Sequence, residues 1–266
     1  MNSNYQQSKW SELLLDAVRT PGKILAAYSA FHNYSLGNGL LALSQCCSRN
    51  LKPGPLNTYQ GWQELGRQVR KGERAITLCM PITAKRKVRV PGPEEEKYVQ
   101  RVIQMFVFRP YWFVLSQTDG DTPYTLQIPG FDLATALQTL NINQVEFDEL
   151  DGNVQGFAAE RRIALNPVAE LPHKTTFHEI AHVVLGHTEE QQMVDSDSTP
   201  RSLREVEAEA VALICCEALG LGGADYCRGY IQHWLQGKDS IPEKPAQKIF
   251  SAATSILKAG QMQTHN

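Results

Sequence analysis

Residues 177–187 have the sequence FHEIAHVVLGH, and this stretch decides how the second half of the chain folds. His178 and His182 are four positions apart, so an α-helix places both imidazoles on one face. The apolar residues between and after them supply a face that buries the helix, and Gly186 is a typical residue just past a helix end. We therefore predict a buried helix over 175–185 that presents two histidines to one metal ion.

This helix predicts a zinc site with an adjacent general base. Two histidines and one carboxylate are the protein ligands of many catalytic zinc sites, which hold one Zn²⁺ and leave a position open. Glu179 lies beside the histidines and would take a proton from a water molecule that zinc makes more acidic. The alternative is a buried helix without a metal, in which the two histidines have no functional role. Burying two unpaired histidines would be costly.

A second acidic helix, expected over 203–218, offers the third ligand. Glu205 and Glu209 lie one turn apart on the same helical face, an arrangement typical of peptidases in which the first acid binds zinc. We predict Glu205 as the metal ligand and Glu209 as the acid that orients a ligand histidine from behind. Glu207 is expected to point elsewhere, into solvent.

His187 is the competing third ligand. The longer pattern H-E-x-x-H-x-x-G-x-x-H needs Gly at 185 and His at 188, whereas this chain has Leu185 and Thr188. We therefore expect His187 to be either a residue at the rim of the site or a cation at the C-terminal end of the helix. Candidates for stabilising a developing oxyanion are His173, Tyr226 and His233.

The remaining elements of the second half are a helix over 131–140 and strands over 145–150 and 156–165. Asp151-Gly152 is a hairpin-type turn signal between these strands. Residues 156–167 fit either an ordinary sheet strand or an edge strand that pairs with an extended peptide substrate. Helices interleaved with a few strands predict an α+β fold.

The first half is also expected to be α+β. Helical spacing covers 8–19, 23–43 and 58–68, and turn residues fill 48–57. Strands are expected over 75–80, 85–90, 99–108 and 111–116. The sequence Asp119-Gly120-Asp121-Thr122-Pro123 is the best domain boundary, so we predict domains 1–122 and 123–266.

Basic and aromatic residues concentrate in one part of the first half. Residues 61–90 hold eight Lys or Arg and only two acids, although the whole chain has a net charge of −2. Cations that follow phosphates, with aromatic rings for bases, are what single-stranded nucleic acid requires. The nucleic-acid-binding candidates are Tyr59, Trp62, Arg67, Arg70, Lys71 and Arg74. Core packing is the competing role for Trp62, and a solvated face the competing role for the basic residues.

The expected cellular location is inferred from the targeting, membrane and disulfide signals in the sequence. The first residues have no basic region followed by an apolar stretch, so we expect no signal peptide. No apolar run reaches the length of a membrane span. The six cysteines, in two adjacent pairs and two single positions, do not resemble a secreted disulfide framework. These features predict a cytoplasmic protein with no membrane partner.

The stretch TYQGWQELGRQVRKGERAI over 58–76 resembles the N-terminal domain of ArdC-type antirestriction proteins. Residues 34–41 and 113–120 extend the resemblance to about 8–120. It implies a single-stranded DNA-binding module of a kind shared with plasmid primases of the TraC type. It also implies a zincin-like second domain, and here 177–187 with 205–212 is similar to the ImmA/IrrE metallopeptidases. Glu209 and Val211 replace the Asn and Phe usual in that group.

The resemblance implies a zinc metallopeptidase-type protein that binds single-stranded DNA and protects mobile DNA from restriction. A protein substrate, either a repressor or a restriction component, is the second expected partner. One alternative is a regulatory protease that cleaves a DNA-bound repressor. Another is a DNA-binding protein without enzymatic activity, in which the zinc is structural.

Overall fold

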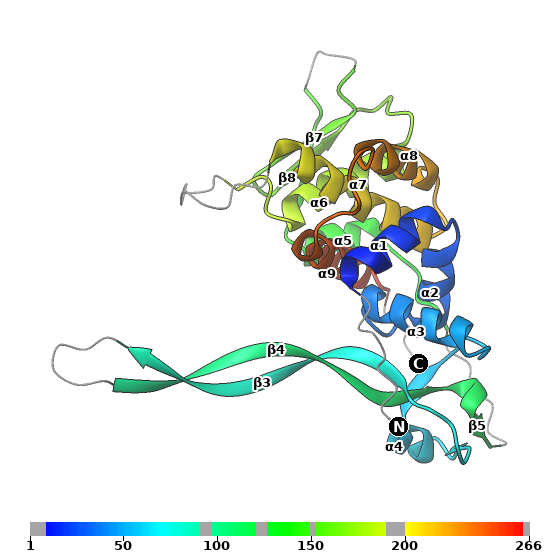
Figure 1. Ribbon diagram of the computed structural model, residues 1–266. Coiled ribbons are helices and arrows are strands. Elements are labelled where there is room, and N and C mark those ends of the chain that lie inside the picture. The colour runs from blue at the N-terminus through cyan, green and yellow to red at the C-terminus, as the bar shows by residue number, and fades with distance from the viewer. Residues whose placement is uncertain (1–8, 91–96, 121–126, 149–152, 190–199, 263–266) are drawn as a thin grey trace. The chain divides into compact units, whose positions relative to one another are not determined.

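The computed structural model describes residues 9–90, 97–120, 127–148, 153–189 and 200–262 (Figure 1). The chain divides into two compact units, one spanning 1–43 with 125–266 and the other spanning 44–124. Helices and small sheets occur in the same chain, which confirms the α+β class. The units do not follow the predicted domains 1–122 and 123–266, because the first 43 residues cluster with the second half of the chain.

The first unit is mainly helical and is built around one buried helix, α7 (Arg201–Ala218). Every residue of α7 from Val206 to Ala218 is buried, so this helix is enclosed by its neighbours rather than amphipathic. Four helices pack against it: α2 (Lys23–Phe31), α6 (Pro172–Val184), α8 (Ala224–Trp234) and α9 (Glu243–Ala259). The shorter helices α1 (Trp10–Arg19) and α5 (Leu133–Thr139) pack on α9. No helix in the described ranges is long and apolar enough to cross a bilayer.

The single helix predicted over 23–43 is two helices, α2 and α3 (Leu36–Ser48). The first amides of α3 are satisfied by side chains, since Leu36 N donates to Thr254 Oγ1 at 3.1 Å and Asn38 N donates to Ser35 Oγ at 3.4 Å. Such bonds replace the carbonyls that a continuous helix would supply. The prediction missed this break because one of the two partners is far away in the sequence.

A three-stranded sheet completes the first unit. Its strands are β6 (Asn143–Val145), β7 (Gly156–Ala159) and β8 (Arg162–Leu165), in the order β6-β8-β7. β6 runs parallel to β8, and β7 antiparallel to it. The single strand predicted over 156–165 is therefore a hairpin, in which Glu160 adopts a left-handed conformation with φ 53°. The predicted turn at 151–152 lies outside the described residues.

Gly156 lets the edge strand β7 approach α6 closely. A Cβ atom at this position would lie 2.9 Å from Ala164 O, 2.9 Å from Thr175 Cγ2 and 3.3 Å from Glu179 Cγ. Such distances are too short for a side chain, so only glycine allows this packing. β7 is thereby placed directly beside Glu179.

The second unit is organised by a long β-ribbon. β3 (Ile76–Val90) pairs antiparallel with β4 (Lys97–Val114), and β1 (Leu56–Thr58) adds to the other edge of β4. A smaller pair joins β2 (Gln68–Val69) to β5 (Thr118–Asp119), which follows the 3-10 turn η1 (Leu115–Gln117). The four predicted strands thus merge into two. A register shift beside Tyr111 allows β4 to continue past Pro110.

The short helix α4 (Tyr59–Glu64) anchors the core of the second unit. Thr58 caps it by accepting the Gly61 amide at 3.1 Å. Trp62 is 0% exposed, and its Nε1–H donates to Phe113 O at 2.8 Å. The predicted helix continued to Gln68, but the Gly66 and Arg67 amides bond back to the carbonyls of Gln63 and Trp62 and end it.

A buried ion pair ties the N-terminal helices to the rest of the first unit. Arg228 of α8 bonds Glu217 of α7 and donates to the carbonyls of Ala17 and Val18 at the end of α1. The second oxygen of Glu217 accepts the Ile24 amide at 2.9 Å. Both charged side chains are only 8% exposed, so each provides the opposite charge that offsets the cost of burying the other.

Replacement of Glu217 by Ala should therefore lower the free energy of unfolding by about 3–5 kcal/mol, because it removes the buried carboxylate that pairs with Arg228 and leaves only the exposed Asp225, at 3.9 Å. The matched control is Asp16→Ala, which removes the more exposed pair with Lys23 and should cost less than about 1 kcal/mol. Urea denaturation followed by circular dichroism measures both. Equal losses for the two variants would contradict this account of the pair.

Candidate metal centre

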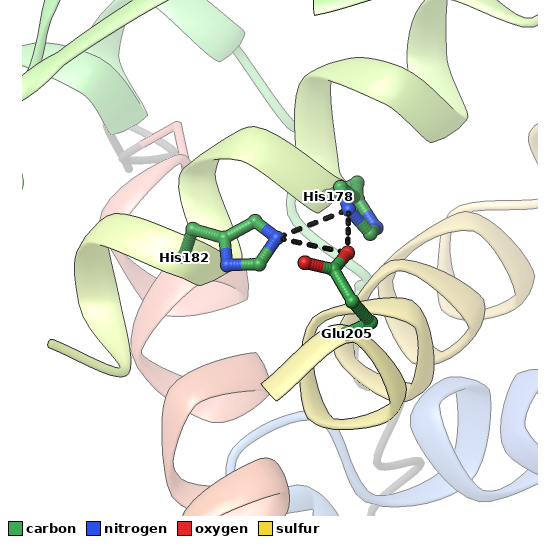
Figure 2. Close-up of side chains that lie close together, drawn as sticks. All are labelled: His178, His182 and Glu205. Atoms are coloured by element: carbon green, nitrogen blue, oxygen red, sulfur yellow. Dashed lines mark hydrogen bonds and ion pairs between the residues drawn. The ribbon is translucent and has the colours of Figure 1, made fainter. Parts of the chain in front are cut away.

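Three side chains from two packed helices converge on one point (Figure 2). His178 and His182 project from α6, and Glu205 projects from the first turns of α7. The Nε2 atoms of the two histidines are 3.1 Å apart, and Glu205 Oε2 lies 3.4 Å from His178 Nε2 and 3.6 Å from His182 Nε2. One ligand atom from each residue lies within 4.8 Å of the other two. The structure thus brings together the three predicted metal ligands.

Glu209, one turn beyond Glu205, lies behind His178. Its Oε2 is 2.8 Å from His178 Nδ1 and 3.0 Å from Lys174 Nζ. The carboxylate is 2% exposed and so depends on these two partners for its charge. Glu209 therefore occupies the orienting position expected of it, and the lysine is an addition that sequence spacing gave no reason to expect.

The histidines and carboxylates of the site shift one another's pKa values. Burial alone would lower the pKa of His178, but its contacts with Glu205 and Glu209 outweigh burial and raise that pKa to about 9. The same contacts with His178 and His182 hold the pKa of Glu205 well below its usual range. A cation is therefore strongly favoured between these carboxylates.

Glu179 lies beside the ligands and is 7% exposed. Burial raises its pKa, although the neighbouring histidines partly offset this effect. A raised pKa suits a carboxylate that must accept a proton near neutral pH and release it again. Glu179 is therefore chemically suited to the general-base role predicted for it.

One prediction about the neighbouring residues is wrong. Glu207, expected in solvent, is 1% exposed, and its Oε2 lies 2.9 Å from His187 Nε2. His187 lines the cavity beside the ligands, as expected of a rim residue, but its side chain is only 8% exposed and its Nδ1 lies 3.0 Å from His182 Nδ1. Their contact depends on the turn after α6, where Gly186 adopts φ 76° and folds His187 back beside His182.

A cavity of about 410 Å³ opens onto the centre. Its walls include the three ligands, Glu179 and the β7 residues Gly156, Phe157 and Ala158. Thr188, Arg201 and Arg204 also line it, and sequence reasoning missed all three because nothing in their spacing points to the histidines. The oxyanion candidates His173, Tyr226 and His233 are not among its lining residues.

The residues present fit a divalent metal ion. Two neutral imidazoles and one carboxylate match the protein ligands of catalytic zinc sites, which leave a coordination position for water or substrate. The Nδ1 atom of His178 faces Glu209 and that of His182 faces His187, so the Nε2 atoms are the ones directed at the common point. The cavity gives that point access from outside.

The candidate DNA-binding residues of the second unit have different environments. The prediction that Trp62 binds nucleic acid is wrong, because its ring is fully buried and cannot stack on a base. Arg67 donates to Thr118 Oγ1 and Gly120 O, and Arg70 contacts Glu73, Asp119 and Ser116 O, so both hold the turn around β5. Arg70 is nevertheless exposed, as are the three other candidates Tyr59, Lys71 and Arg74.

Fold and site together define a protein with one unit built on a β-ribbon and another that holds a His-His-Glu cluster. Residues 7–112 match the family model of the N-terminal domain of anti-restriction factor ArdC. The solved structure of metal-free antirestriction protein ArdC from plasmid R388 is 22% identical, with a TM-score of 0.52 and 94% of each chain covered. Its Mn(II)-bound structure is 21% identical, with a TM-score of 0.50 and coverage of 94% of this chain and 95% of that one. No match is found among curated proteins.

Proposed function

We propose that this chain is a single-stranded DNA-binding antirestriction protein whose helical unit is a zinc-dependent peptidase. The observation that carries the enzymatic part is the placement of Glu179 beside the His178–His182–Glu205 cluster in a cavity walled by β7. A metal supplies Lewis-acid polarisation of the scissile carbonyl and of the attacking water when it is bound. That the Mn(II)-bound ArdC of R388 shares this fold supports a divalent ion at the cluster.

The roles of the chain's own residues follow from their positions. Glu179 takes a proton from the water that attacks the carbonyl, and then delivers it to the leaving amine. β7 ends the order β6-β8-β7, so its outer edge offers backbone groups to an extended peptide. Gly156, Phe157 and Ala158 of that strand line the same cavity as Glu179. A peptide paired with β7 would therefore pass over the cluster.

The ligand set favours a catalytic metal over a structural one. Structural zinc sites are typically closed by four protein ligands, whereas the described residues supply three. Imidazole with a single carboxylate also suits zinc better than manganese, which prefers oxygen ligands. The three-ligand set favours the peptidase over a DNA-binding protein with a structural metal, and the ligand types favour zinc as the ion.

The DNA-binding part rests on the match to the ArdC N-terminal domain and on the surface of the second unit. Lys71 and Arg74 are exposed, and so is Tyr59 of the same unit, at 45%. Tyr111, at the register shift of the ribbon, is 52% exposed and offers another aromatic face. Cations and exposed rings on one small unit suit a flexible polyanion with stacking bases.

Glu179→Gln should lower peptide cleavage by about 10²–10⁴-fold, because it removes the general base and leaves the ligands in place. Cleavage of an unstructured protein such as casein, and of a peptide library, measures the rate in zinc-loaded protein. Metal content of the same samples should equal that of the wild type. Glu170→Gln, at an exposed position, is the matched control. Undiminished cleavage by Glu179→Gln would refute the catalytic role, and unequal metal content would refute the division of roles.

Lys71→Ala combined with Arg74→Ala should weaken binding of a single-stranded oligonucleotide and flatten its salt dependence. Loss of two phosphate contacts reduces the slope of log K against log salt by about 1.4 for single strands. Fluorescence anisotropy titrations at several salt concentrations provide this slope. Arg67 and Arg70 are left intact because they hold the turn around β5.

The control for this double variant is Lys244→Ala with Lys248→Ala, which removes two exposed cations from α9 in the other unit. Its slope should equal that of the wild type. If both double variants change the slope equally, the second unit is not the DNA-binding surface.

A further inference from the structure

A chain of side chains leads from the metal cluster into the protein interior. His182 Nδ1 lies 3.0 Å from His187 Nδ1, and His187 Nε2 lies 2.9 Å from Glu207 Oε2. The side chains of His187 and Glu207 are 8% and 2% exposed, so water contributes little to this arrangement. The opposite nitrogen of His182 faces His178 and Glu205 (Figure 2).

Only one arrangement of protons satisfies this chain when His182 uses Nε2 as a ligand. Its Nδ1 must then carry the proton and donate it to His187 Nδ1. His187 therefore accepts at Nδ1, carries its own proton at Nε2, and donates to Glu207. The carboxylate at the end of the chain thus selects the tautomer of His187, and His187 selects the ligand-competent tautomer of His182.

The carboxylate of Glu207 is a buried negative charge with few partners. One of its oxygens bonds His187, and the other has no hydrogen-bond partner within the described residues. Burial of a carboxylate with so few partners is costly unless a positive charge acts on it. Glu209 has Lys174 for this purpose. For Glu207, a cation held by His178, His182 and Glu205 would supply this charge through His182 and His187.

We propose that His187 and Glu207 are positioning residues of the metal centre, which act through His182 to raise its affinity for the ion. This inference rests on the proposed metal site. Each ligand histidine is then backed by an acid from α7, His178 directly by Glu209 and His182 through His187 by Glu207. Support of this kind fixes the orientation of a ligand ring and increases its basicity.

Zinc affinity of Glu207→Gln and of His187→Phe, measured by competition with a chromophoric chelator, should fall about 10–100-fold. The double variant should lose no more than the stronger single variant, because either change breaks the same chain. In the cobalt-substituted wild type, NMR should show an exchangeable, paramagnetically shifted N–H signal from His182. That signal should shift in Glu207→Gln and exchange rapidly with water in His187→Phe.

Glu170→Gln and His233→Phe are the matched controls at exposed positions, and both should bind zinc as the wild type does. Thermal unfolding in the presence of a chelator shows whether each variant folds. If His187→Phe does not fold, the zinc affinity of Glu207→Gln decides the question, because this substitution keeps the shape of the side chain. Affinities within twofold of wild type, or losses that add in the double variant, would overturn the inference while leaving the metal site intact. Absence of zinc binding by the wild type would overturn both.

Discussion

The packing of α6 against α7 fixes the distance between two histidines and Glu205, and the chemistry of the helical unit depends on that distance. Neither helix contains a complete site. α6 presents His178 and His182 because they are one turn apart, and α7 presents Glu205 and Glu209 for the same reason. Because α7 is buried from Val206 onward by four other helices, it cannot move away from α6 without opening the core.

Acidic residues on a buried helix are an energetic liability, and the structure shows how each is stabilised. Glu217 is paired with Arg228, and Glu209 contacts Lys174 and His178. Glu205 faces both histidines, which hold its pKa low. One oxygen of Glu207 bonds His187, and the other has no hydrogen-bond partner among the described residues. The acids near the site are therefore arranged around the position of a cation, and a bound ion would stabilise them collectively.

Local periodicity allowed the sequence to predict the helix of His178 and His182, and the choice of Glu205 and Glu209. It failed where long-range contacts decide the outcome. The break before Leu36 depends on Thr254, and the roles of His187 and Glu207 depend on the left-handed turn at Gly186. The continuous β4 strand depends on the register shift beside Tyr111. Trp62 has the spacing of a core residue, and its burial agrees with that alternative rather than with stacking on DNA.

The central claim is that His178, His182 and Glu205 together hold one zinc ion. X-ray absorption spectroscopy of the zinc-loaded protein tests it most directly, because imidazole, carboxylate and thiolate ligands give distinguishable scattering. The account predicts one ion per chain, with two imidazole nitrogens at about 2.0–2.1 Å, oxygen ligands at about 2.0–2.2 Å and no sulfur. Sulfur at about 2.3 Å, or a single imidazole, would contradict it, since the metal would then lie elsewhere in the chain.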